Sequence, residues 1–440
     1  MNKRISIIAA CLALLMLAGC TQLLPTTVPS ATTPVTTAPT APHTTPTSNV
    51  GQTTVGTIPT QPTEEPTTSI VVTPTGTTVV TSPPPTTTVP PAPGVVRLYT
   101  CDAQQYETYV ALAAEYYAQT GTEVLILTPA EGQSCEEAIT GLLETEQAPS
   151  LFCIHSQQML QQLQDRLYDL TGTVAVEQLY STEFAQNVDG KMLALAMDVG
   201  GSGLIYNASK LAMAGFTESD INDFSRLQIT VSYLTANKST LGYAFTAPDF
   251  TDEHLMEHLA GLYPDTAQLR AFLDLYLKNC TSKTTTLNYF LKGTTVFFIG
   301  GTAEYDQVSA LGGNNLGFLP AYSQDTATVQ CFSSLYWAVN STIYSGDVQE
   351  TVDFLAWLVT NQGSGVPVDR LGMLSPYAQA THADNILEKK LREYIADGNV
   401  HVTWELAGNV EDLAAFTAAL KTYASSTTDE NWAAVEACFS

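Results

Sequence analysis

The sequence predicts an α/β protein with two lobes, preceded by a long linker without regular structure. Strand-like and helix-like segments alternate three times after residue 95, which is typical of an α/β sheet with parallel strands. The region from Val95 onward holds about 345 residues, more than one hydrophobic core usually supports, so we expect two lobes. The composition also changes at this point, from Thr and Pro to mixed sequence.

The first twenty residues, MNKRISIIAACLALLMLAGC, have the order of an export signal: basic residues, an apolar run, then small residues. The run is shorter than the about 20 apolar residues that span a bilayer comfortably. Its end, Leu17-Ala18-Gly19-Cys20, resembles the lipobox of bacterial lipoproteins. That resemblance implies a signal peptide over residues 1–20 and a lipidated Cys20 that anchors the protein on the outer face of the cell membrane. An ordinary cleaved secretory signal is the alternative.

Residues 21–94 are rich in Thr and Pro and nearly free of charge, as in VVTSPPPTTTVPPAPG. Such a segment cannot form a packed core and favours extended, polyproline-like chain. We expect a disordered stalk that holds the folded region away from the membrane. Ser/Thr-Pro tracts are also common sites of O-glycosylation.

The charge and the cysteines limit the function classes. A formal net charge of −26 argues against nucleic acid, because phosphates require a basic surface. Eight cysteines occur, and six remain if Cys11 is removed and Cys20 is lipidated. Export permits disulfides, but the spacings are wide and contain no CxxC pair, so bridges and free buried thiols both stay open.

The elements after residue 95 follow in order. The strand VVRLYTC precedes a helix, which is predicted by apolar residues at helical spacing: Tyr106, Tyr109, Val110, Ala113 and Tyr117. Gly121 is its expected C-cap. The strand TEVLILTP, a helix near residues 136–146, the strand SLFCIH and the helix QQMLQQLQDRLYDL follow.

Three glycines interrupt the apolar segment AMDVGGSGLIYN, residues 196–207. A dinucleotide fingerprint would require GxGxxG opening directly into a helix, and LIYN intervenes here. We expect a strand, a glycine-rich break and a second short strand, so that pliable backbone carries the chain from one lobe to the other.

Several passages resemble the family 1 extracellular solute-binding proteins of ATP-driven importers, which include the maltose-binding proteins. They are Gly190-Lys191 with LIYN, Lys210 and Gly215; LKGTTVFFIGGTAEYDQV followed by NNLGFLPAY; YWAVNS with the helix after it; and the final helices. The resemblance covers Val95 to Ser440. It implies two α/β lobes of the periplasmic-binding-protein type, joined by crossings near residues 198–203, 332–337 and 377–384, with a solute held in the cleft between them.

On this resemblance, one lobe comprises residues 95–200 and 337–380, and the other residues 201–336 and 381–440. Ligands of α/β lobes lie at the carboxyl ends of the strands. We therefore expect solute contacts from nine residues at strand ends and crossings: Asp102, His155, Asp198, Ser202, Asp249, Glu304, Tyr305, Ser334 and Trp337.

A carbohydrate, and an oligosaccharide in particular, is the favoured solute, because carboxylates accept hydroxyl bonds and aromatic faces pack against sugars. Sugar-binding relatives supply a stacking tryptophan two residues after the glycine that corresponds to Gly301, where this chain has Ala303; Tyr305 is the expected substitute. Another neutral or cationic small solute is the alternative.

The stretch His254-Leu-Met-Glu257-His258 fits H-x-x-E-H, the motif of inverted zinc peptidases. A further carboxylate ligand would be needed, and we interpret the stretch as the solvated face of an amphipathic helix, with adventitious zinc binding at most. We expect no catalytic residue, no metal site and no cofactor.

The predicted protein is therefore a monomeric, lipid-anchored binding protein that delivers its solute to an ABC importer permease. A non-transport surface lipoprotein, either a sensor or a glycan adhesin, is the alternative on the same fold. A hydrolase is the third class, and it would consume the ligand.

Overall fold

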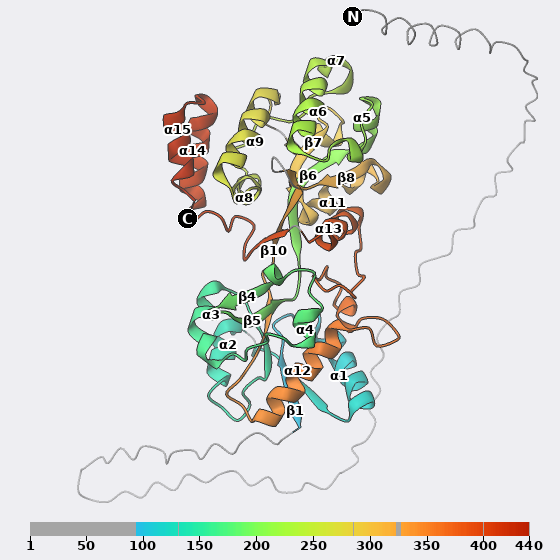
Figure 1. The fold of residues 1–440 in the computed structure, drawn as a ribbon, viewed down its shortest axis with the longest axis vertical. Helices are drawn as coiled ribbons and strands as arrows, with labels where there is room; N and C mark the ends of the chain where they lie inside the picture. The colour runs from blue at the N-terminus through green and yellow to red at the C-terminus, as the bar shows by residue number, and fades with distance from the viewer. Residues whose placement is uncertain (1–93, 131, 285, 323–326, 399, 440) are drawn as a thin grey trace, which may run out of the picture. The chain divides into compact units, whose positions relative to one another are not determined.

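The computed structural model describes residues 94–130, 132–284, 286–322, 327–398 and 400–439 (Figure 1). The predicted signal peptide, Cys20 and the linker up to residue 93 lie outside the described residues. The described chain forms two sheets covered by helices, which confirms the predicted α/β class with two lobes. None of its helices combines the length and apolar character needed to cross a lipid bilayer.

The first sheet has the strand order β2-β1-β3-β11-β5-β4. β1 runs parallel to β2 and β3, as the alternation predicted, but β11 is antiparallel to both β3 and β5, so the sheet is mixed. β11 is an interior strand although it lies far along the chain from its neighbours. The strands are β1 (Val95–Tyr99), β2 (Glu123–Leu127), β3 (Leu151–Ile154), β4 (Ala185–Val188), β5 (Lys191–Ala196) and β11 (Tyr336–Val339).

Alternate residues of these strands enter different cores, because successive side chains of a strand point to opposite faces. Leu98 of β1 packs in a core with α1 and α12, whereas Tyr99 packs in a core with α2 and α3. Both faces of the sheet are thus covered, which explains its nearly continuous apolar strands. The helices are α1 (Tyr106–Thr120), α2 (Cys135–Leu142), α3 (Gln157–Leu163), α4 (Val174–Glu177) and α12 (Ser345–Val359), with the 3-10 helices η1 (Gln164–Arg166), η2 (Thr182–Phe184) and η7 (Pro367–Leu371).

Helix α1 confirms the predicted helix, but its buried face coincides only in part with the predicted one. Gly121 is its left-handed C-cap, as expected. The buried residues are Tyr109, Leu112, Ala113 and Tyr116. Tyr106, Val110 and Tyr117, also predicted on the buried face, are 36%, 38% and 57% exposed. The sequence contains apolar residues around most of this helix, so spacing alone could not select the stripe that the sheet covers.

The chain passes from the first sheet to the second between β5 and β6, over residues 197–199, and returns between β10 and β11, over residues 333–335. A third passage leads from η7 to α13. The two short passages lie side by side, because β10 and β6 are paired in the second sheet while β11 and β5 are paired in the first.

The prediction of a glycine-rich break between two strands is wrong, since Gly200, Gly201 and Gly203 lie inside β6. They are required for close approach rather than for pliability. A Cβ at Gly200 would lie 2.2 Å from the ring of Phe332, and one at Gly203 would lie 2.3 Å from the carbonyl oxygen of Leu319. A side chain at either position would therefore collide with a neighbouring strand.

The second sheet has the order β12-β10-β6-β7, with β8 paired to β6 and β9 paired to β10. Its strands are β6 (Gly200–Asn207), β7 (Phe297–Gly301), β8 (Leu316–Leu319), β9 (Ala321–Tyr322), β10 (Ala327–Phe332) and β12 (Val400–Thr403). One face packs on α6, α8, α9, α14 and α15, and the other packs on α10, α11 and α13.

The helices of this region include the closing pair α14 and α15, which the family resemblance implied and which pack against each other (Figure 1). They are α5 (Ala208–Met213), α6 (Phe224–Ala236), α7 (Lys238–Leu241), α8 (Glu253–Gly261), α9 (Thr266–Asn279), α10 (Thr286–Leu291), α11 (Tyr305–Val308), α13 (Ile386–Ala396), α14 (Leu413–Ser425) and α15 (Asp429–Glu436), with the 3-10 helices η3 (Glu218–Asp220), η4 (Thr302–Glu304), η5 (Ser309–Leu311) and η6 (Gly313–Asn315).

Candidate functional site

A cavity of about 640 Å³ lies where elements of the first sheet meet elements of the second. We call it the cleft cavity. One wall comes from the β3–α3 junction and from β4, and the opposite wall comes from β12 and the loop after it. The lining residues are His155, Ser156, Gln157, Gln186, Ser334, His401, Val402, Thr403, Trp404, Glu405, Gly408, Asn409, Val410 and Glu411.

Local structure fixes the first wall. Ser156 is the N-cap of α3, and its hydroxyl accepts a hydrogen bond from the backbone N–H of Met159 at 3.0 Å. His155 and Gln157, on either side of this cap, come directly after the buried strand β3 in the chain. His155 and Gln157 are therefore presented at the carboxyl end of a strand that is itself held in the core, which is where ligands of α/β sheets lie.

Trp404 connects the two walls. Its indole N–H donates to the side-chain oxygen of Gln186 at 3.1 Å, and its ring lies 4.3 Å from the ring of Tyr336, centroid to centroid. Trp404 is 9% exposed, so most of its ring is enclosed by these neighbours. The contact joins the end of β12 in the second sheet to β4 in the first.

The cleft cavity is lined mainly by polar groups: imidazoles, hydroxyls, amides and the carboxylates of Glu405 and Glu411. Burial lowers the pKa of His155, and the nearby charge of Glu136 opposes that shift in part. A neutral imidazole has one donor and one acceptor nitrogen. Together these groups can donate to and accept from the hydroxyls of a small polar molecule.

His155 and Ser334 are the two predicted residues that line the cleft cavity, and Asp198 is hydrogen-bonded to Ser334. The carboxylate of Asp198 accepts hydrogen bonds from Ser333 at 2.9 Å and Ser334 at 3.4 Å. Burial raises the pKa of Asp198, although the hydroxyl of Ser333 opposes the shift. These bonds tie the passage at residues 197–199 to the passage at residues 333–335.

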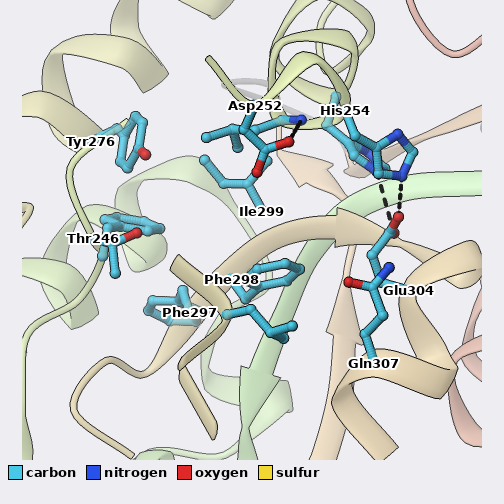
Figure 2. A pocket seen from close by; sticks show the side chains of 13 residues that line it. Thr246, Asp252, His254, Tyr276, Phe297, Phe298, Ile299, Glu304 and Gln307 are labelled. Atoms are coloured by element: carbon cyan, nitrogen blue, oxygen red, sulfur yellow. Dashed lines mark hydrogen bonds and ion pairs between the residues drawn. The ribbon is translucent and has the colours of Figure 1, made fainter. Parts of the chain in front are cut away.

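Ser202 and Glu304 lie elsewhere. Glu304 lines a second cavity of about 180 Å³ among elements of the second sheet (Figure 2), and Ser202 contacts His258, which lines the same cavity. Both are almost fully buried, with exposed fractions of 1% and 2%. The hydroxyl of Ser202 lies 2.8 Å from Nδ1 of His258, and the carboxylate of Glu304 contacts His254. The structure therefore brings these two predicted residues together with the H-x-x-E-H motif.

That placement corrects our interpretation of the motif as a solvated helix face. His258 is 2% exposed, because α8 packs this side against β6 and β7. Only the His254 side is open, with 46% of its side chain exposed. The apolar residues around the motif satisfy an amphipathic pattern in which a buried histidine cannot be distinguished from a surface one.

Three of the remaining predicted residues have local structural roles. Asp249 accepts hydrogen bonds from the backbone N–H and the hydroxyl of Thr251. Tyr305 begins α11 and packs against the core between the sheets. Trp337 is fully buried in β11, stacked 6.4 Å from Tyr377, so it has no exposed face for a solute in this arrangement.

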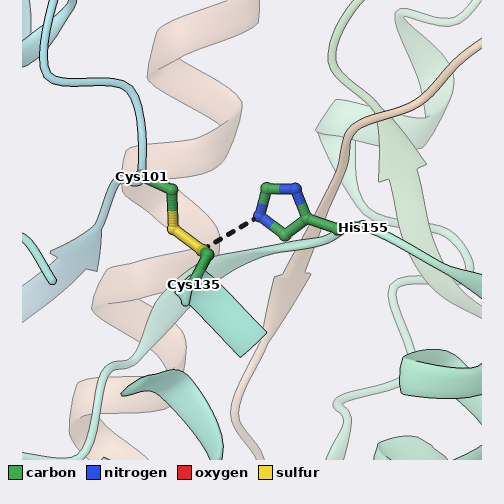
Figure 3. A group of neighbouring side chains, drawn as sticks. All are labelled: Cys101, Cys135 and His155. Atoms are coloured by element: carbon green, nitrogen blue, oxygen red, sulfur yellow. Dashed lines mark hydrogen bonds between the residues drawn. A yellow bond between two sulfur atoms is a disulfide. The ribbon is translucent and has the colours of Figure 1, made fainter. Parts of the chain in front are cut away.

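His155 also contacts a disulfide, which joins Cys101 to Cys135 (Figure 3). Its Nε2 lies 3.2 Å from the sulfur of Cys135. The bridge connects the end of β1 to the start of α2. In the described residues the remaining cysteines, at 153, 280, 331 and 438, are free.

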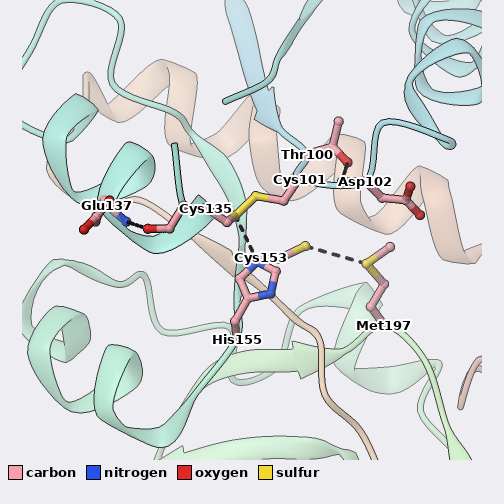
Figure 4. Close-up of a disulfide and its surroundings, with 9 residues drawn as sticks. Thr100, Cys101, Asp102, Cys135, Glu137, Cys153, His155 and Met197 are labelled. Carbon is pink, nitrogen blue, oxygen red and sulfur yellow. Dashed lines mark hydrogen bonds between the residues drawn. A yellow bond between two sulfur atoms is a disulfide. The ribbon is translucent and has the colours of Figure 1, made fainter. Parts of the chain in front are cut away.

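Asp102 directly follows Cys101 in the chain, and its exposed carboxylate points away from the disulfide (Figure 4). One oxygen accepts the backbone N–H of Gln104 at 2.8 Å, which is ordinary turn chemistry. The ninth predicted residue is thus next to Cys101, whose disulfide partner Cys135 contacts His155, but it does not line the cleft cavity.

Sequence reasoning missed the second wall of the cleft cavity. His401 comes from β12, and Trp404, Glu405 and Asn409 come from the polar loop directly after it. The signal is a short run rich in β-branched residues that ends in Trp-Glu and a glycine. The helical pattern of the carboxyl-terminal region dominates its surroundings, so this short strand does not stand out.

A family profile described as bacterial extracellular solute-binding protein matches residues 111–364, more than half of the chain. The chain is similar in fold to RafE of Streptococcus pneumoniae (12% identity, TM-score 0.58, covering 79% of this chain and 98% of that one). It is also similar to a family 1 extracellular solute-binding protein of Bifidobacterium longum subsp. infantis (14%, 0.58, 78% and 97%). A third similar structure is the cyclic alpha-maltosyl-1,6-maltose binding protein of Arthrobacter globiformis (15%, 0.55, 79% and 98%).

No curated protein matches the chain in sequence. At these identities the solved structures establish the fold alone, and they agree with the two helix-covered sheets described above. The profile match establishes the family: this chain belongs to the bacterial extracellular solute-binding proteins, a family of binding proteins and not of enzymes.

Proposed function

We propose that this protein captures a small carbohydrate in the cleft cavity and delivers it, unchanged, to an ABC importer permease. The observation that carries the proposal is the cleft cavity itself. It has polar groups on two walls that belong to different sheets, so a molecule bound there contacts both. A ligand that contacts both walls at once favours their approach, which is the basis of hinge closure.

A sugar fits the chemistry of the lining. Its hydroxyls both donate and accept, and the lining offers carboxylates, amides, hydroxyls and imidazoles for both roles. The solved structures include proteins named for binding maltosyl-maltose and β-D-galactopyranose, which supports the same class of solute. The volume of about 640 Å³ is within the range of pockets that take small ligands.

The proposed hinge consists of the two short passages and the hydrogen bonds between them. Asp198 in one passage holds Ser333 and Ser334 in the other, so the two backbones move together. We assign residues 95–200 and 337–380 to one lobe and residues 201–336 and 381–440 to the other. The protein is further proposed to be monomeric and anchored to the outer face of the membrane through Cys20.

A thermal-shift screen tests the solute class. The purified protein is heated with monosaccharides, oligosaccharides, polyamines and peptides, and the sugars are recovered and analysed afterwards. A carbohydrate that raises the melting temperature and is recovered intact supports the proposal. If all sugars are silent while a polyamine or a peptide raises the melting temperature, carbohydrate is the wrong class. If the recovered sugar is cleaved, the protein is not a simple binder.

A matched pair of variants locates the binding. Glu405→Gln changes a carboxylate of the cleft cavity, and Glu430→Gln changes an exposed carboxylate on α15. A charged hydrogen bond to a ligand is worth about 1.5–3 kcal/mol, so Glu405→Gln should weaken binding at least about tenfold. Equal affinities for the two variants would place the solute elsewhere. Retention on a polymeric glycan without any small-molecule response would indicate an adhesin.

A further inference from the structure

Three potential metal ligands converge beside the second cavity: His254 and His258 of α8, and Glu304 in η4, at the end of β7. The two histidines are four residues apart, so their side chains lie on one face of the helix, one above the other. Asp252 caps the helix by accepting the N–H of Leu255 at 3.2 Å, which fixes the turn that carries His254. Figure 2 shows the carboxylate of Glu304 directed at the imidazole of His254.

Both imidazoles present the same nitrogen to Glu304. Nε2 of His254 contacts one carboxylate oxygen, and Nε2 of His258 lies 3.2 Å from the other. The ligand atoms of the three side chains all lie within 4.8 Å of one another. One cation can therefore be reached by all three with small side-chain rotations.

The opposite nitrogen of each ring is held by an oxygen. Nδ1 of His254 lies 2.9 Å from the carboxylate of Glu257, and Nδ1 of His258 lies 2.8 Å from the hydroxyl of Ser202. When Nδ1 donates to such an oxygen, Nε2 carries the lone pair. This outer arrangement orients metal-binding histidines generally and strengthens them as ligands.

His258 Nε2 is an unsatisfied buried atom. Although it is 3.2 Å from Glu304, the alignment does not make a hydrogen bond, and no other partner is present among the described residues. Buried polar atoms nearly always have a partner. A nitrogen lone pair that faces a carboxylate requires a proton or a cation between them.

Glu304 supplies the negative charge for such a cation. Its side chain is only 2% exposed, and its carboxylate also accepts the backbone N–H of Gly301. A carboxylate charge in so closed an environment is costly unless an opposite charge lies beside it.

We propose that His254, His258 and Glu304 bind one divalent transition-metal ion, Zn²⁺ by preference, through two imidazole nitrogens and one carboxylate. Imidazole ligands favour Zn²⁺ over Ca²⁺ and Mg²⁺, which prefer all-oxygen sites. Three protein ligands leave one position of a tetrahedral ion free. The cavity of about 180 Å³ beside the site can hold a water molecule or a small ligand at that position.

The proposed ion joins α8 to the end of β7 within one lobe, and Ser202 of β6 holds Nδ1 of His258. It does not depend on the identity of the solute, because none of its ligands lines the cleft cavity. The half-exposed His254 gives the ion a route from solvent.

The test is a Zn²⁺ titration of the chelator-treated, dialysed protein, purified without a polyhistidine tag and followed by calorimetry and by melting temperature. Glu257 and Glu304 raise the pKa of His254 against the effect of burial, so the titration is run at about pH 8, where protons compete less. We expect one equivalent of bound Zn²⁺ and a rise in melting temperature, with no comparable response to Mg²⁺.

The variants separate this site from adventitious binding. His254→Ala removes a half-exposed ligand without opening the core and should abolish the high-affinity step, and Glu257→Gln should weaken it about 10–100-fold. His382→Ala, a partly exposed histidine elsewhere, is the matched control and should bind like the wild type. Co²⁺ bound in place of Zn²⁺ should give the visible absorption of a four-coordinate N/O site, lost in His254→Ala.

Two results would overturn the proposal. One is the absence of saturable Zn²⁺ binding to the wild-type protein, which would mean that protons bridge the three side chains. The other is Zn²⁺ binding that persists in His254→Ala with unchanged affinity, which would assign the ion to other groups such as the free thiols.

Discussion

Replacing Gly203 with alanine should destabilise the protein, whereas the same replacement at Gly141 should not. A Cβ at Gly203 would lie 2.3 Å from the carbonyl oxygen of Leu319 and 2.9 Å from the ring of Phe318. Carbon–oxygen contacts of this kind are normally about 3.3 Å or longer, so β8 would have to move by about 1 Å. Both atoms belong to β8, whose backbone is paired to β6, so the strand cannot yield without loss of pairing.

The expected cost follows from overpacking, which destabilises folded proteins by about 1–3 kcal/mol. Gly141 lies inside α2, where a Cβ would have no atom within 4 Å, and alanine there should stabilise the helix by about 0.5–1 kcal/mol. Unfolding free energies from denaturant titrations of the two variants should therefore differ by about 1.5–4 kcal/mol.

Gly201→Ala gives an intermediate test, because its nearest neighbours are the methyl groups of Leu391, which can rotate away. A Gly203→Ala protein as stable as the wild type would refute the close-approach explanation. The glycines would then act as a pliable crossing, and the substitution would change solute affinity and not the unfolding free energy.

Three further outcomes are expected. Trp404→Phe keeps an aromatic ring beside Tyr336 but loses the bond to Gln186, so the unfolding free energy should fall by about 0.5–1.5 kcal/mol, as measured by denaturant titration. Asp198→Asn removes a carboxyl whose pKa is raised in the folded protein. The stability that this carboxyl contributes to the wild type is lost as the pH rises from its unfolded pKa to its folded pKa. The variant should therefore gain stability relative to the wild type across that pH range, measured as unfolding free energy against pH. Reduction of the disulfide between Cys101 and Cys135, which closes a loop with a separation of 34 residues, should lower the unfolding free energy by about 3–4 kcal/mol, measured with and without reductant.

Each of these has a control. For the tryptophan, a Gln186→Leu variant should lose a similar amount, and the double variant should lose no more than the larger single change; additive losses would contradict the bond. For the aspartate, a stability difference that is constant with pH would mean that burial does not perturb it. For the disulfide, an unchanged melting temperature in reductant would contradict the loop-closure argument.

Local sequence rules predicted the elements better than their pairing. β1, β2 and β3 follow from β-branched and aliphatic runs, and α1 from helical spacing with Gly121 at its end. The place of β11 between β3 and β5 could not be predicted from these rules, because nothing within YWAV specifies distant partners. The family resemblance supplied the two lobes, which residue patterns alone only suggested through length.

The candidate site was predictable where it follows a strand and not where it depends on tertiary packing. His155 directly follows β3, and strand ends are where ligands lie, so it could be found. Trp404 could not, since its role depends on Gln186 and Tyr336 from the other sheet. Glu304 follows β7 as expected, but Ser202, expected in the first crossing, lies inside β6. Both contact the buried His258, which the amphipathic pattern of α8 did not reveal.

The interior position of β11 has a consequence for the order in which the chain acquires structure. Until residues 336–339 are available, β2-β1-β3 and β5-β4 are two separate ribbons with no hydrogen bonds between them. While most of the second sheet is still incomplete, both ribbons therefore have edges that can pair wrongly. Completion of the earlier half waits for the later half, so folding of the first sheet depends on contacts between distant parts of the chain.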